Sequence, residues 1–133
     1  MSTGHMPHEI GPRDIELAAL TRALLSRLPP AELPVTYRNL AKLLRLEPPN
    51  TIHQLTNALE VLMREDTAAG VPMIAALVVS RWRGGLPAPG FFELASLLGR
   101  YAGPETGSEA QDFHQRELLA ALAHWVGATH GTG

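Results

Sequence analysis

The chain has 133 residues, of which 45% are hydrophobic, and this is enough for one folded domain with a single core. Its formal net charge of −2 at pH 7 excludes a strongly basic protein that binds nucleic acid indiscriminately. The absence of cysteine excludes disulfides, thiolate metal sites and thiol catalysis.

Residues 1–12 are interpreted as a flexible N-terminal tail. The first predicted helix runs from about Arg13 to Leu28, because apolar residues recur there at helical spacing. Pro29 and Pro30 end it, since proline cannot donate a helical hydrogen bond.

The middle of the chain predicts a helix-turn-helix between two strands. A short strand (Val35–Tyr37) precedes a basic helix (Arg38–Leu46), a second helix (Thr51–Asp66) and an apolar strand (Met73–Ser80) that we expect to pair with the first. The turn Arg81–Gly85 follows. This order predicts a mainly α protein with a small β-sheet, a winged helix-turn-helix whose wing is the Arg/Gly turn.

A further helix is predicted over Phe91–Tyr101, which completes a winged-helix domain of residues 13–102. Residues 103–127 supply a linker and an additional C-terminal helix from Ser108 to about Val126. This helix either packs on the domain or forms a dimer seam. Residues 128–133 are expected to be a flexible tail.

Basic residues of the Arg38–Leu46 helix and of the wing turn are the candidate phosphate contacts. The three on the helix are spaced i, i+4 and i+7, so they share one face. Trp82 lies between the two wing arginines and either stacks on a partner or folds back on the proline-rich loop. The alternative for the basic residues is a solvated helix face and a polar turn. The five candidates are Arg38, Lys42, Arg45, Arg81 and Arg83.

The predicted third helix is the candidate groove-reading element. We expect it to bury Ile52 and to expose His53, Gln54 and Asn57, and amide side chains suit adenine edges. Glu60, Glu65 and Asp66 follow on the same helix and would repel phosphate. These charges favour the plainer interpretation of a solvated polar face.

The segment from Val35 to Tyr101 resembles a known family. Val35–Ala41, the helix at Thr51–Leu59 and Val78-Val79 before a glycine-rich loop are similar to the DNA-binding domain of alkylguanine-DNA alkyltransferases and their non-catalytic alkyltransferase-like relatives. The resemblance implies a place for Tyr37 at the phosphate beside a flipped nucleotide. The inserted arginine of the family falls near His53, and its reactive cysteine falls on Ala75. Methyl transfer is therefore excluded, because it requires a thiolate nucleophile.

These patterns predict a non-catalytic protein that binds double-stranded DNA, with no cofactor. The alternative is a protein–protein interaction module or small regulatory subunit on the same fold, using Trp82, the proline-rich loop and the last helix. A homodimer or a protein partner held through the C-terminal helix is compatible with either function.

No catalytic or metal site is predicted. The six histidines are scattered without ligand spacing, and no nucleophile–base arrangement or phosphate-binding glycine loop occurs. No stretch reaches the length of a membrane span, and no signal-peptide pattern is present, so we expect a cytoplasmic protein.

Overall fold

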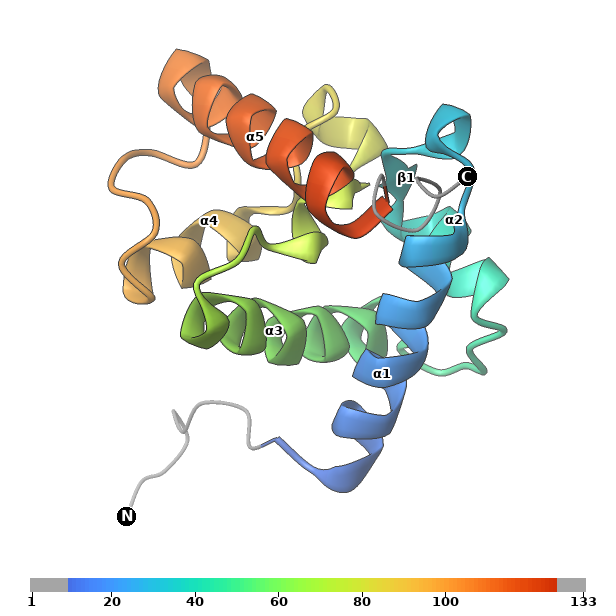
Figure 1. The fold of residues 1–133 in the computed structure, drawn as a ribbon. Helices are drawn as coiled ribbons and strands as arrows, with labels where there is room; N and C mark the ends of the chain where they lie inside the picture. The colour runs from blue at the N-terminus through green and yellow to red at the C-terminus, as the bar shows by residue number, and fades with distance from the viewer. Residues whose placement is uncertain (1–9, 127–133) are drawn as a thin grey trace.

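The structure is a computed structural model that describes residues 10–126 (Figure 1). The predicted tail 128–133 lies outside the described residues, as does the predicted tail 1–12 except for its last three positions. The described residues form five α-helices and a two-stranded sheet, so a mainly α fold with a small β-sheet is confirmed.

The helices and strands follow in chain order. The α-helices are α1 (Pro12–Arg27), α2 (Tyr37–Leu43), α3 (Thr51–Ala69), α4 (Pro89–Leu97) and α5 (Gly107–Ala121). The strands are β1 (Val35–Thr36) and β2 (Val78–Val79). Short 3₁₀ turns are η1 (Pro30–Glu32), η2 (Ile74–Leu77) and η3 (Arg81–Arg83), and α5 continues into a π-helical turn, η4 (Leu122–Val126).

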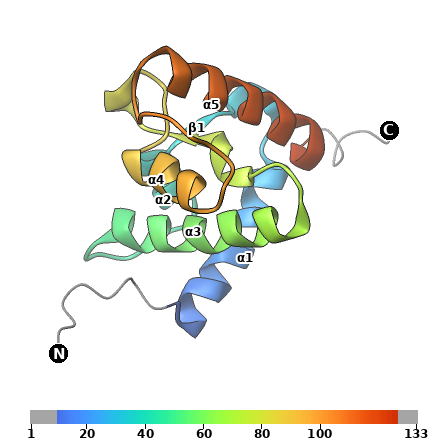
Figure 2. The same ribbon diagram turned by 90° about the vertical axis from the view of Figure 1, so that its left-hand side faces the viewer.

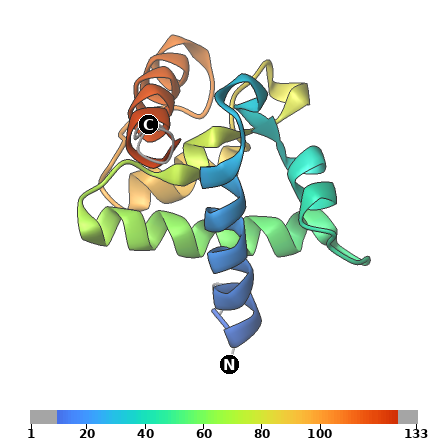
Figure 3. The same cartoon turned by 45° about the vertical axis from the view of Figure 1, so that its right-hand side comes forward.

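Helix α1 packs across α3, and the two helices cross at a steep angle in Figure 3. Pro12 occupies the first turn of α1, where its missing N–H costs no hydrogen bond. The Asp14 carboxylate accepts a hydrogen bond from the Gly11 N–H at 3.0 Å, and the helix ends two residues before Pro29. The predicted first helix is confirmed to within a residue at each end.

Helix α2 begins one residue before its predicted start, so Tyr37 belongs to the helix and not to the strand, and the helix ends three residues earlier than predicted. The Thr36 side chain caps it by accepting a hydrogen bond from the Asn39 N–H at 3.1 Å. Arg45 has a left-handed backbone with φ of 57°, which takes the chain out of the helix after Leu43. Residues 44–50 therefore form the turn before α3.

The predicted strand Met73–Ser80 is mostly not a strand. Only β2 pairs, in parallel with β1 and with Val35 opposite Val78, so the expected pairing partner is confirmed and the expected length is wrong. The backbone N–H groups ahead of η2 are bound by side chains instead. Ile74 donates to the Asp66 carboxylate at 2.9 Å, and Met73 donates to Glu117 at 2.8 Å. These bonds satisfy buried donors without a β-ladder.

The buried segment η2 lies between α3 and α5 (Figures 1 and 2). Phe113 of α5 stacks on Tyr101 with ring centroids 4.6 Å apart and lies 6.4 Å from Phe92. The His114 imidazole is buried, and its Nε2 lies 2.9 Å from the Ala76 carbonyl oxygen of η2. One face of the C-terminal helix is thus buried within the chain.

Candidate nucleic-acid interface

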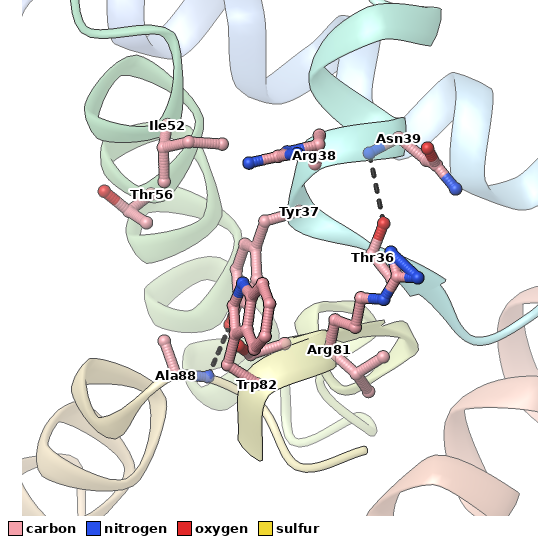
Figure 4. Close-up of a pocket in the computed structure, with 11 residues that line it drawn as sticks. Thr36, Tyr37, Arg38, Asn39, Ile52, Thr56, Arg81, Trp82 and Ala88 are labelled. Atoms are coloured by element: carbon pink, nitrogen blue, oxygen red, sulfur yellow. Dashed lines mark hydrogen bonds between the residues drawn. The ribbon is translucent and has the colours of Figure 1, made fainter. Parts of the chain in front are cut away.

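A recess opens where the start of α2, the first turns of α3 and the segment after β2 come together (Figure 4). We call it the arginine recess. Its volume is about 560 Å³, within the usual range for a small-ligand cavity. It is lined by Thr36, Tyr37, Arg38, Asn39, Ile52, Thr56, Val79, Ser80, Arg81, Trp82 and Ala88.

Two of the predicted phosphate contacts meet in this recess. Arg38 is the second residue of α2, and Arg81 begins η3 directly after β2. In Figure 4 the Arg38 side chain extends toward α3, whereas Arg81 extends toward the junction of β1 and α2. Both arginines are exposed, and none of the described residues that line the recess carries a carboxylate. The recess is therefore positively charged.

Trp82 lies at the mouth of the same recess and is 86% exposed. Ile52, which the sequence predicted to be buried, is 43% exposed and lines the recess from α3. The prediction was wrong because Ile52 lies in the first turn of α3, beyond the part of the helix that the core covers. An indole ring and an aliphatic side chain thus lie beside two guanidinium groups.

Tyr37 forms one wall of the recess and also lines a smaller pocket of about 50 Å³ that contains Ala75. Its hydroxyl oxygen accepts a hydrogen bond from the Ala88 N–H at 2.9 Å. Burial raises the pKa of Tyr37 to about 12, although this hydrogen bond and the charge of Arg83 lower it. The phenol therefore stays neutral at physiological pH and ties α2 to the loop before α4.

Arg83 does not belong to the recess. Its Nε donates to the Pro87 carbonyl at 3.0 Å, and its Nη2 donates to the Glu105 carbonyl at 2.7 Å. Its guanidinium also lies 6.0 Å from the centre of the Phe92 ring. Arg83 thus binds loop carbonyls of the protein itself, whereas the phosphate contact predicted for both wing arginines stays a prediction.

The three basic residues predicted to share one helix face, Arg38, Lys42 and Arg45, do not all lie on α2, because the helix ends at Leu43. Arg45 lies beyond Leu43 and lines a different cavity, about 600 Å³ in volume, between α1, the 44–50 turn and the start of α3. We call this the α1–α3 groove. Lys42 is exposed and lines neither cavity. Of these three basic residues, only Arg38 lines the arginine recess.

The predicted base-reading residues of α3 also line the α1–α3 groove. Gln54 is engaged there, donating through Nε2 to the carbonyls of Glu47 at 3.0 Å and Pro49 at 2.9 Å. Asn57 is only 8% exposed, which corrects the expectation of an exposed side chain. His53 lines the groove too, together with the carboxylates of residues 14, 16 and 47. These residues therefore line a different cavity from Arg38 and Arg81.

The acidic end of α3 is paired within the protein. Arg22 of α1 lies 3.0 Å from the Glu65 carboxylate and 2.9 Å from that of Asp66. Asp66 is 2% exposed, so it cannot act as a surface charge. The Arg22 guanidinium also lies 4.4 Å from the centre of the Trp125 ring. The sequence led us to expect that Glu60, Glu65 and Asp66 would repel phosphate, but Glu65 and Asp66 are both paired with Arg22. Glu60 lines the small pocket beside the arginine recess, which shares Tyr37, Thr56 and Ala88 with it.

Sequence reasoning missed several polar residues of the recess. Asn39 and Thr56 come from α2 and α3, and Ser80 follows β2. The spacing of Asn39 from the capping residue Thr36 marks the start of α2, but it does not indicate which side chains line the cavity. No signal in the sequence links Thr56 or Ser80 to the same cavity.

The chain matches no protein-family model, no curated protein and no solved structure. Among residues 10–126 no group of three or more histidine or acidic side chains is placed to hold a metal ion. Within the same range, none of the helices combines the length and the apolar character needed to cross a membrane.

Proposed function

We propose that this protein is a non-catalytic DNA-binding protein with a winged helix-turn-helix architecture, and that the arginine recess is its DNA contact. Helix α2, the 44–50 turn and α3 supply the helix-turn-helix, and the segment Arg81–Gly85 after β2 supplies a short wing. In this arrangement the first helix and the wing both approach the phosphate backbone.

The observation that carries the proposal is the convergence of Arg38 and Arg81. They lie 43 residues apart in sequence, and they share a cavity whose described lining has no carboxylate, in a chain of net charge −2. Guanidinium groups bind phosphate with two parallel hydrogen bonds, which makes arginine the side chain best suited to such a site.

The proposal includes no alkyl transfer. Ala75, which stands where the resembling family has its reactive cysteine, is buried and presents a methyl group to the small pocket behind Tyr37. A methyl group cannot act as a nucleophile. The protein would therefore bind DNA without modifying it.

Fluorescence anisotropy with a labelled duplex over a salt series tests the proposal. Two phosphate contacts predict that the logarithm of the binding constant falls against that of salt concentration with a slope of about −2. The double variant Arg38→Glu/Arg81→Glu should lose most of this slope and weaken binding at least about tenfold. A matched control, Arg27→Glu/Arg116→Glu, makes the same charge change at exposed positions outside the recess and should bind nearly as well as wild type.

Equal losses in the two double variants would mean that only net charge matters, and would contradict a specific role for the recess. No binding of either a duplex or a single strand by the folded protein at low salt would sink the DNA proposal. The second candidate, a protein-interaction module, would then take its place. The exposed pair Trp82 and Ile52 favours it, because aromatic anchors dominate protein interfaces.

A further inference from the structure

Of the five basic residues predicted to contact phosphate, two lie close together. The exposed Lys42 lines neither the arginine recess nor the α1–α3 groove. Arg83 is held by loop carbonyls, and Arg45 lies in the α1–α3 groove beside carboxylates, which leaves Arg38 and Arg81 in one cavity. Proteins that bind an intact duplex usually have several basic side chains, each in contact with a different phosphate along the backbone. Two arginines that line a single cavity suit a few neighbouring phosphates of one DNA strand better than they suit the two backbones of a duplex.

Trp82 offers an aromatic face on which an unpaired base can stack but a base within a duplex cannot. Its indole is 86% exposed at the mouth of the arginine recess, so most of the ring is open to solvent. Both faces of a base in a duplex are covered by its neighbours, whereas an unpaired base has a free face. Stacking on such an aromatic side chain is the main sequence-tolerant contact in single-strand binding.

The other residues that line the recess could contact the apolar and hydrogen-bonding atoms of a base. Ile52 and Val79 supply apolar surface, and the exposed Asn39 amide offers both a donor and acceptors. The Thr56 hydroxyl donates to the His53 carbonyl at 3.0 Å, so its lone pairs face a ligand only as acceptors. The cavity thus combines a stacking surface, polar groups and two cations.

We propose that the arginine recess binds an unpaired nucleotide of single-stranded DNA, with the base against Trp82 and the flanking phosphates at Arg38 and Arg81. This inference rests on the proposed DNA-binding function and specifies the form of DNA that the recess accepts.

The test compares two labelled probes by fluorescence anisotropy at one salt concentration: an oligothymidine of about 12 nucleotides and a blunt duplex of two annealed strands of the same length. We expect the oligothymidine to bind at least about tenfold more tightly. Trp82→Ala should weaken its binding about tenfold, and Trp82→Phe should restore most of the loss, since a phenyl ring also stacks. Leu97→Ala, which removes an apolar side chain of α4 that is 75% exposed, is the matched control and should change nothing.

The possible failures are distinguishable. Duplex binding equal to or tighter than oligothymidine binding, or a Trp82→Ala variant that binds like wild type, would overturn this inference and leave the DNA-binding proposal standing. Failure of both probes to bind would overturn the two together. Because Trp82 is exposed, the variants should keep the wild-type circular dichroism spectrum, and a loss of binding then reports the site rather than the fold.

Discussion

Arg81 and Arg83 are two residues apart but have different surroundings. Arg81 is exposed at the arginine recess, whereas the half-buried Arg83 donates hydrogen bonds to the carbonyls of Pro87 and Glu105. We propose that Arg81 contacts a ligand, whereas Arg83, two residues later, holds loops of the fold together. Sequence alone could not separate them, because the carbonyls that bind Arg83 come partly from a loop 22 residues away.

The contrast gives a prediction at the residue level. Arg83→Ala should lower the free energy of unfolding by about 1–3 kcal/mol, because two carbonyls lose charged donors. Arg81→Ala should stay within about 0.5 kcal/mol of wild type. Urea denaturation measures both. A larger stability loss in Arg81→Ala than in Arg83→Ala would show that the roles assigned to the two side chains are wrong.

At the level of elements, Asp66 joins α1, α3 and η2. Its carboxylate pairs with Arg22 at 2.9 Å and accepts the Ile74 N–H at 2.9 Å while almost fully buried. Glu65 contacts the same arginine from a side chain that is 53% exposed. Removing a buried partner leaves a charge and a donor unsatisfied, while an exposed ion pair contributes little.

We therefore expect Asp66→Ala to destabilise the protein by about 3 kcal/mol and Glu65→Ala by less than about 1 kcal/mol. Chemical denaturation of the two variants, which remove neighbouring carboxylates, gives a matched comparison. Similar losses in both would contradict the importance of the buried bond to η2.

His114 joins α5 to η2 through the hydrogen bond between its Nε2 and the Ala76 carbonyl, and we expect the stability that it contributes to depend on pH. A carbonyl oxygen only accepts, so Nε2 carries the proton donated to Ala76, and burial lowers the pKa of His114 even though this hydrogen bond raises it. The neutral ring is favoured in the folded state. Below a pH of about 6.5 the unfolded chain binds more protons, so the free energy of unfolding falls as pH falls through the lower folded pKa.

The variant His114→Gln isolates this effect, because its amide also donates a hydrogen bond but does not titrate. Wild type should lose more stability than His114→Gln between about pH 7.5 and pH 5.5 in urea denaturation. If the two proteins lose the same amount, the pH dependence belongs to other groups.

At the level of the whole molecule, apolar periodicity and proline positions in the sequence predicted the helices, but they did not predict which residues line the arginine recess together. The limits of α1 follow from Pro12 and Pro29, which act within a few residues. The 3₁₀ course of η2 and the burial of Asn57 depend on α1 and α5, which are distant in sequence, so periodicity could not reveal them. Arg38 and Arg81 were both predicted as phosphate contacts, but their meeting with Ile52 and Thr56 in one cavity depends on the tertiary fold.

The most direct test of the account is an NMR titration of ¹⁵N-labelled protein with a DNA hairpin that carries a single-stranded overhang. We predict chemical-shift changes at the backbone amides of Arg38, Asn39 and Arg81 and at the indole N–H of Trp82, with the Trp125 indole N–H, bound to the Pro72 carbonyl, unchanged. Changes centred on the α1–α3 groove around Arg45, or none at saturating DNA, would contradict it.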